Sequence, residues 1–124
     1  MGQYGELGQI DKGYLDENTT LVTVSIGGND AGFGPVIKER IMNLSQLCQD
    51  VTIPEIGNEP LRMALPKHIQ GPVCASIIQA LQAIHRAAPN ARIVLMGYPV
   101  VVEATSNGCN GVVDLEAHWI KEVT

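Results

Sequence analysis

A run from Thr20 to Phe33, with the sequence TLVTVSIGGNDAGF, joins an apolar segment directly to two glycines, an asparagine and an aspartate. The first part, residues 21–26, is mostly β-branched and apolar, which predicts a strand buried on at least one face inside a parallel sheet. Glycines end this strand. Either the chain only turns there, or the turn presents a polar side chain to a ligand.

A second apolar run, RIVLM at residues 92–96, ends in the sequence GYP. Before it, residues 72–88 place an apolar side chain at every third or fourth position, which predicts an amphipathic helix. Another helix is predicted to begin at Pro35. Strand, helical connection and strand form the pattern of a parallel sheet with a right-handed crossover. We therefore expect an α/β fold.

The remaining segments are less regular. Residues 49–70 contain three prolines and one glycine, and we expect a long loop with short helical pieces. Residues 104–111 are predicted to be a loop, and residues 112–124 begin another helix. Because two parallel strands alone make a poor sheet, we expect residues 1–124 to be part of a larger domain.

Composition excludes several classes of protein. The 124 residues are 45% hydrophobic and 17% charged, which is typical of a single globular domain. The net charge of −5 and the lack of clustered Lys and Arg argue against a nucleic-acid partner. No apolar run approaches the roughly 18 residues of a membrane-spanning helix. We expect no structural zinc site, since the cysteines lack C-x-x-C spacing.

The three cysteines, Cys48, Cys74 and Cys109, leave two alternatives open. All three are reduced thiols, or two of them form a disulfide and the third has its partner outside this chain. A bond between Cys48 and Cys74 would tie together the two ends of the 49–70 segment. In chain-entropy terms such a closure contributes roughly 3–4 kcal/mol if it is unstrained.

The glycine turn lies where α/β proteins place their ligands, at the carboxyl end of a strand. Gly27 and Gly28 allow a sharp turn and a close approach of substrate. Asn29 offers a carboxamide N–H donor, which can stabilise the oxyanion of acyl transfer by roughly 3–4 kcal/mol. Asp30 is suited to holding the loop through its side chain. The alternative is that these four residues serve only as a turn.

The sequence LVTVSIGGNDAGF strongly resembles the third signature block of the SGNH (GDSL) hydrolase family, particularly its secreted actinobacterial lipases and esterases. The resemblance continues through APNARIVLMGYP and a cysteine-bearing loop, and is weakest at residues 49–70. It implies a three-layer, flavodoxin-like α/β fold with a parallel sheet. It also implies a secreted enzyme that cleaves ester or lipid substrates through an acyl-serine intermediate, without metal or cofactor.

Four residues define that family: a serine in a Gly-Asp-Ser segment, a glycine, an asparagine, and a histidine in Asp-x-x-His. Only the asparagine has a place in this sequence, at Asn29, with Gly27, Gly28 and Asp30 shaping its loop. Neither Gly-Asp-Ser nor Asp-x-x-His occurs in the 124 residues. We therefore expect the serine and histidine to lie before residue 1 and after residue 124, and the isolated chain to be inactive.

The resemblance also implies a disulfide between Cys48 and Cys74, with Cys109 pairing beyond residue 124. Other candidate residues are interpreted structurally. Ser25 is expected to pack within a strand, and His68 and His85 to lie on the surface. Asp114 and His118 are four residues apart, one too many for the family motif, which favours a contact along a helix.

Two other functions remain open. A non-catalytic binding or interaction module that kept the hydrolase scaffold would explain the missing motifs equally well, although it has no chemical need for Asn29. A phosphate-binding protein is a weaker alternative, because Asp30 would repel phosphate. Exposed sheet edges would favour self-association.

Overall fold

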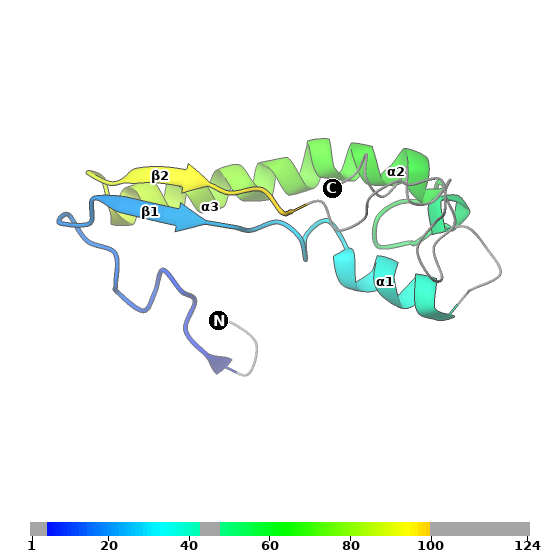
Figure 1. Cartoon of the computed structure of the whole chain (residues 1–124), viewed down its shortest axis with the longest axis horizontal. Helices are drawn as coiled ribbons and strands as arrows, with labels where there is room; N and C mark the ends of the chain where they lie inside the picture. The colour runs from blue at the N-terminus through cyan, green and yellow to red at the C-terminus, as the bar shows by residue number, and fades with distance from the viewer. Residues whose placement is uncertain (1–4, 43–47, 100–124) are drawn as a thin grey trace. The chain divides into compact units, whose positions relative to one another are not determined.

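The computed structural model describes residues 5–42 and 48–99 (Figure 1). Its elements are, in order, β1 (Leu21–Val24), α1 (Phe33–Met42), the 3-10 turn η2 (Cys48–Asp50), α2 (Leu61–His68), the π turn η3 (Ile69–Val73), α3 (Cys74–Ala87) and β2 (Arg92–Leu95). The chain forms two compact units. Of the described residues, those up to Ile26 and Ala75–Met96 form one unit, and those of Gly27–Cys74 together with residues 97–99 belong to the other.

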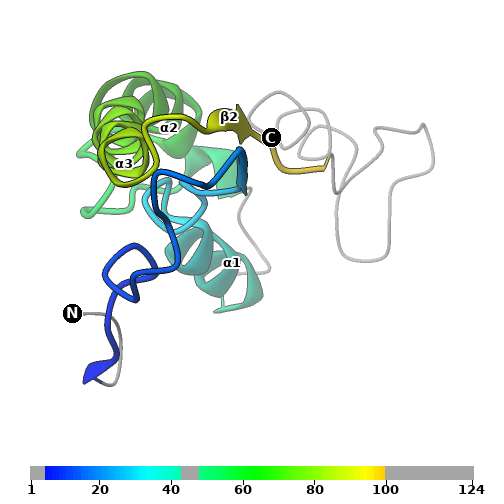
Figure 2. The same cartoon turned by 90° about the vertical axis from the view of Figure 1, so that its left-hand side faces the viewer.

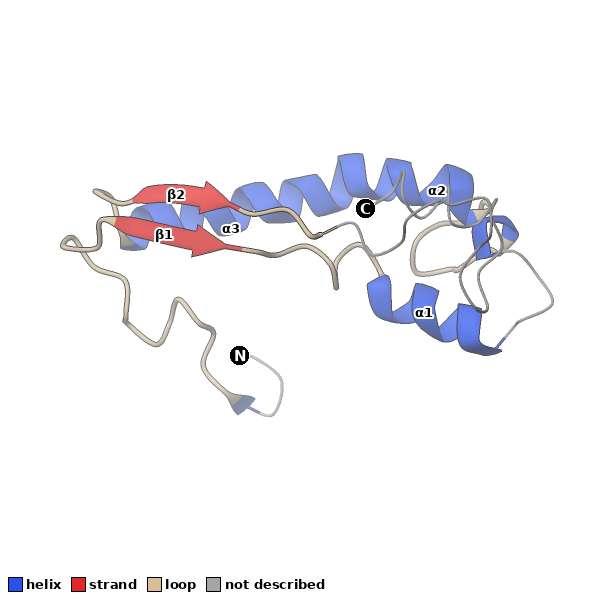
Figure 3. Cartoon of the chain, in the orientation of Figure 1, coloured by secondary structure: helices blue, strands red, loops and turns tan. Residues whose placement is uncertain are grey.

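The first unit contains a two-stranded parallel sheet, β1 and β2, as the sequence predicts (Figure 3). Leu21 pairs with Arg92, and Val24 pairs with Leu95. Backbone hydrogen bonds extend the ladder beyond both ends, from Arg92 N–H to the Thr20 carbonyl at 2.9 Å and from Met96 N–H to the Val24 carbonyl at 2.8 Å. The strands are shorter than the predicted ranges 21–26 and 92–96.

The prediction that these strands are buried is wrong for the described residues. None of the strand residues is fully buried, and Leu21 and Leu95 are 56% and 46% exposed. The helix α3 lies along one side of the strand pair (Figure 2), and the buried residues Ile84 and Ala88 come from its last turn and the residue that follows it. Three apolar strand residues, Leu21, Val94 and Leu95, are exposed to solvent.

A closed turn precedes β1. Asp16 Oδ1 accepts hydrogen bonds from the Asn18 N–H at 2.9 Å and from the Thr19 hydroxyl at 3.1 Å, and that hydroxyl in turn accepts the Asp16 N–H at 3.1 Å. The Asn90 side chain donates to the Glu17 carbonyl at 2.8 Å, which links this turn to the turn that precedes β2. Both strands therefore start from turns that are joined by a hydrogen bond.

The segment predicted to be mostly loop, residues 49–70, is helical from residue 61 onward. The helix α2 begins directly after Pro60, and Pro66 lies inside it. It continues without interruption into η3, which contains Pro72, and then into α3. A π turn accommodates a local mismatch in the helical hydrogen-bond ladder, such as the one that proline creates. The prolines therefore interrupt hydrogen bonds without ending the helix.

The second unit has a small apolar core beneath this segment. Its buried members come from α2 and from the stretch before it, and are Ile53, Ile56, Leu61, Ala64 and Leu65. Partly buried residues that pack against them are Val36, Val51 and Ile69. Ion pairs between Arg62 and Asp50 and between Lys67 and Glu59 lie on the outside. Since exposed pairs contribute little, apolar packing stabilises this unit.

The disulfide predicted between Cys48 and Cys74 is not formed in the structure. Cys74 is a free thiol at the start of α3, and its side chain is exposed to solvent. The side chain of Cys48 and the whole of Cys109 lie outside the described residues. Within the described residues, no helix has the length and apolar character needed to cross a membrane.

The turn at Asp16 predicts a measurable titration. The hydrogen bond from the Thr19 hydroxyl, followed by the bond from the Asn18 N–H, lowers the pKa of Asp16 below its ordinary value. The stabilising effect of this carboxylate is fully present above its pKa in the unfolded chain, about 3.9, and is lost as the pH falls through the lower pKa of the folded chain. Thr19→Val removes the hydroxyl and should raise the pKa of Asp16, as measured by ¹³C NMR. Thr52→Val, at an exposed position elsewhere, should leave it unchanged.

The core of the second unit predicts a contrast within α2. Leu61 is fully buried whereas Met63, two residues later, is 52% exposed. Leu61→Ala should lower the free energy of unfolding by about 2–5 kcal/mol, because it removes buried methyl groups and leaves a cavity. Met63→Ala should change it by less than about 0.5 kcal/mol. Urea unfolding of the two variants measures this difference, and equal losses would contradict the assignment of the core.

Candidate functional site

The residues Gly27–Gly32, called the Asn29 loop below, form a closed turn between β1 and α1 (Figure 1). Three backbone hydrogen bonds close it: Ala31 N–H to the Gly27 carbonyl at 2.8 Å, Gly32 N–H to the Asn29 carbonyl at 3.0 Å, and Phe33 N–H to the Gly28 carbonyl at 3.1 Å. The loop is therefore an ordered turn that leads directly into the helix.

Both glycines of the pair have a steric reason to be glycine. Gly27 has a φ of 105°, in the left-handed region that other residues rarely adopt. Gly28 lies against the ring of Tyr98, and a Cβ atom added to Gly28 would lie 3.1 Å from the Tyr98 Cζ and Oη atoms. A larger residue at either position would move the loop or the tyrosine.

Tyr98 also makes a polar contact with the loop. The Gly28 N–H donates a hydrogen bond to Tyr98 Oη at 3.3 Å. Tyr98 belongs to the GYP sequence that follows β2, and sequence analysis gave it no role beyond ending a strand. The signal that could have identified it is the parallel pairing, because segments that leave the carboxyl ends of paired parallel strands start side by side.

His68 contacts the loop from another direction. Its Nε2 atom lies 2.8 Å from the backbone carbonyl of Asp30, so Nε2 carries the proton and donates. The prediction that His68 is a simple surface residue missed this contact. His68 is the last residue of α2, and no local pattern links it to a residue 38 positions earlier.

Asn29 itself is exposed at the end of this turn. Within the described ranges 5–42 and 48–99, no residue forms a hydrogen bond with its carboxamide. Asp30 is exposed as well, and its backbone rather than its carboxylate makes the contact with His68. The loop thus presents an amide donor to solvent on a backbone that is held by hydrogen bonds.

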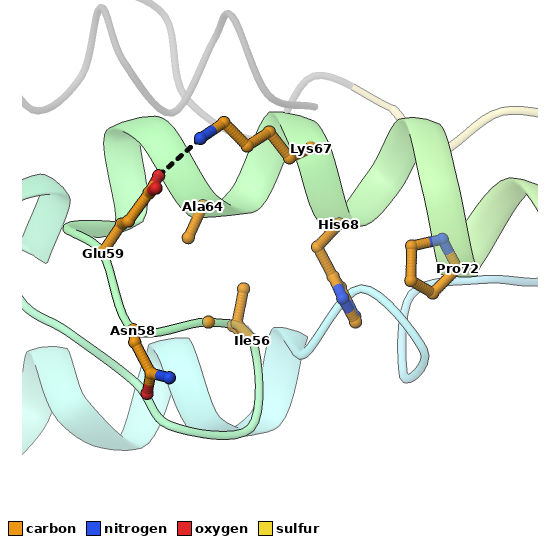
Figure 4. A pocket seen from close by; sticks show the side chains of 8 residues that line it. Ile56, Asn58, Glu59, Ala64, Lys67, His68 and Pro72 are labelled. Carbon is orange, nitrogen blue, oxygen red and sulfur yellow. Dashed lines mark hydrogen bonds and ion pairs between the residues drawn. The ribbon is translucent and has the colours of Figure 1, made fainter.

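A shallow cleft of about 340 Å³ lies beside His68 (Figure 4). Its lining combines apolar and polar residues: Ile56, Gly57, Asn58, Glu59, Ala64, Lys67, His68 and Pro72. An ion pair between Lys67 Nζ and Glu59 Oε2, 2.6 Å apart, lies at its edge. Asn29 is not among the residues that line this cleft, so the cleft and the exposed carboxamide are separate features.

The other candidate residues are not brought to the loop. Ser25 is exposed just after β1, instead of packing within a strand as predicted. His85 is exposed in the last turn of α3, and Asp114 and His118 lie outside the described residues. Over the described part of the chain, no group of three or more His, Cys, Asp or Glu side chains is arranged to hold a metal ion.

The chain is similar to two Streptomyces lipases. It is 32% identical to Lipase 1 of Streptomyces coelicolor over 95 residues, and this match covers 77% of this chain and 30% of that protein. It is 31% identical to a lipase of Streptomyces rimosus over 86 residues, and this match covers 68% of this chain and 28% of that protein. The chain therefore spans less than a third of the length of these relatives. No protein-family model matches it.

Two solved structures have a similar fold. The crystal structure of an extracellular lipase from Streptomyces rimosus matches with a TM-score of 0.70 and 27% identity, over 88% of this chain and 42% of that one. Phospholipase A1 from Streptomyces albidoflavus NA297 matches with a TM-score of 0.70 and 23% identity, over 90% and 43% of the two chains, and supports the fold alone. The predicted α/β fold class is confirmed.

The positive φ of Gly27 predicts a loss of stability when a larger residue replaces it. Gly27→Ala should lower the free energy of unfolding by about 1–3 kcal/mol, because alanine is disfavoured at this positive φ. Gly34→Ala is the matched control, since an added Cβ there meets no atom within 4 Å and alanine favours the helix that contains it. Urea unfolding of both variants tests this, and the conformational argument fails if Gly27→Ala is as stable as the unchanged chain.

Proposed function

Because this chain belongs to the actinobacterial family of lipases and esterases, we propose that it is the central part of a serine hydrolase that cleaves carboxylic esters, with Asn29 as an oxyanion donor. The observation that carries the proposal is the exposed Asn29 carboxamide, presented on an ordered turn after a parallel strand. This is the end of the strand at which α/β folds bind their ligands.

The proposed reaction proceeds in two acyl-transfer steps. A serine hydroxyl attacks the ester carbonyl carbon while a histidine takes the serine proton, and the carbonyl oxygen becomes an oxyanion. The Asn29 Nδ2–H donates to that oxygen and stabilises the tetrahedral intermediate. The alcohol then leaves with the proton, and water releases the acid from the acyl-serine by the same steps. No metal or cofactor takes part.

In this proposal the serine and the histidine lie outside residues 1–124, since neither Gly-Asp-Ser nor Asp-x-x-His occurs within them. The isolated chain would then have no catalytic turnover. We further propose a lipid or other ester as substrate and secretion of the whole protein, because the relatives are lipases and the solved Streptomyces rimosus structure is of an extracellular enzyme.

A second candidate is a non-catalytic binding or interaction module on the same scaffold. The absence of both catalytic motifs from the 124 residues favours it. It differs from the first candidate in one chemical requirement, because a scaffold without acyl-transfer chemistry does not need a hydrogen-bond donor at residue 29.

The discriminating experiment uses the complete open reading frame that contains this chain, expressed from its source. Hydrolysis of a p-nitrophenyl ester is expected, and Asn29→Ala should lower kcat by about 10²–10³-fold while changing KM little. Asn29→Asp, which is nearly isosteric but replaces the donor with a carboxylate, should lose a similar amount. Asn18→Ala, an exposed asparagine in the turn before β1, is the matched control and should keep full activity.

Two results would reject the enzyme proposal. One is a reading frame that stops directly outside residues 1 and 124, which would support the binding module. The other is ester hydrolysis by the 124-residue chain at a rate that is proportional to the concentration of the chain and is unchanged by Asn29→Ala.

A further inference from the structure

We propose that Tyr98 and His68 are positioning residues that hold the Asn29 loop from two sides and thereby fix the direction of its carboxamide. This inference rests on the proposed function, because it assigns a role at the same site. Neither residue touches the reacting atoms in this scheme. They act through the backbone on either side of Asn29.

Tyr98 holds the residue before Asn29. Its hydroxyl oxygen accepts the Gly28 N–H at 3.3 Å, and a Cβ atom added to Gly28 would lie 3.1 Å from the Tyr98 Cζ and Oη atoms, a tight contact that would require the ring to shift. The hydrogen bond orients the Gly28 N–H toward the tyrosine, and the close ring limits how the Gly28 backbone can rotate.

His68 holds the residue after Asn29. Its Nε2–H donates to the Asp30 carbonyl at 2.8 Å, from the end of a helix whose preceding turn packs into the apolar core. Leu65, three residues before His68, is 6% exposed and fixes this end of α2. The Asp30 carbonyl is therefore bonded to a group that is itself held in place.

Together, the bond from His68 and the turn's own bonds give a donor to each of four successive carbonyls of the loop. The carbonyls of Gly27, Gly28 and Asn29 each accept a backbone N–H from within the turn, and His68 supplies the donor for the fourth carbonyl in succession, that of Asp30. A catalytic donor must be held near its productive geometry before the substrate arrives, and supporting hydrogen bonds achieve this. Tyr98 and His68 bond to two backbone groups that the turn's own hydrogen bonds do not use, Gly28 N–H and Asp30 C=O.

The first experiment removes each contact in the complete hydrolase. Tyr98→Phe keeps the ring and removes the acceptor, and His68→Ala removes the donor. Each should lower kcat about fivefold, the size of one hydrogen bond, with KM unchanged. His68→Gln offers an amide donor and should recover most of the loss. The controls are Tyr14→Phe and His85→Ala, which alter an exposed tyrosine and an exposed histidine away from the loop.

The second experiment asks whether the effect passes through Asn29. In an Asn29→Ala background, Tyr98→Phe and His68→Ala should cause no further loss of kcat, because the group that they position is gone. A full additional fivefold loss in that background would overturn the inference and indicate a separate effect. No loss from either single variant in an active, Asn29-dependent enzyme would also overturn it.

A third measurement does not depend on turnover. Amide hydrogen exchange of Gly28 in the 124-residue chain, followed by NMR, should accelerate about fivefold in Tyr98→Phe and remain unchanged in Tyr14→Phe. Unchanged exchange at Gly28 would show that Tyr98 does not hold the loop and would overturn the inference. Failure of the proposed function is distinct, because it appears as an absence of ester hydrolysis in the unsubstituted enzyme.

Discussion

Parallel strands need a long connection between them, because the second strand must start at the same edge of the sheet as the first. Here the connection runs from Ser25 to Ala91 and contains every helix that the structure describes. The pairing of β1 with β2 then starts two outgoing segments side by side, one leading to Gly28 and the other to Tyr98. The contact between those two residues, 70 positions apart, follows from this arrangement.

The organisation of the loop matters more for the proposed chemistry than its burial does. Asn29 is exposed, yet the backbone on both sides of it is held by hydrogen bonds. Three carbonyls are bonded by N–H groups of the turn and the first residue of α1. The Gly28 N–H is bonded to Tyr98, after β2, and the Asp30 carbonyl to His68, at the end of α2. An exposed side chain on a fixed backbone can meet a substrate without first being ordered, so less of the binding free energy is lost to entropy. The small apolar core beneath α2 serves this purpose by fixing the helix that carries His68.

Local patterns were sufficient for the elements whose signal is periodic or compositional. The β-branched run at residues 21–24 and the apolar repeat of α3 are of this kind, and so is the glycine pair that ends the first strand. The helical segment at residues 61–70 was missed because proline is a strong local breaker, whereas in the structure the segment packs around Leu61 and continues through a π turn. Tyr98 and His68 could not be assigned to the loop from sequence, since each contact depends on tertiary structure.

The hydrogen bonding of the loop has a consequence for the Asn29 side chain itself. An asparagine in a turn commonly turns inward and bonds to a nearby backbone group. In this turn the carbonyls of Gly27, Gly28, Asn29 and Asp30 already have donors, which leaves little local competition for the carboxamide hydrogens. Because each of these carbonyls already accepts one hydrogen bond, it competes less strongly for the Asn29 amide hydrogens, which stay available to an incoming acceptor. A change that removes one of these donors would create a stronger internal competitor for the substrate.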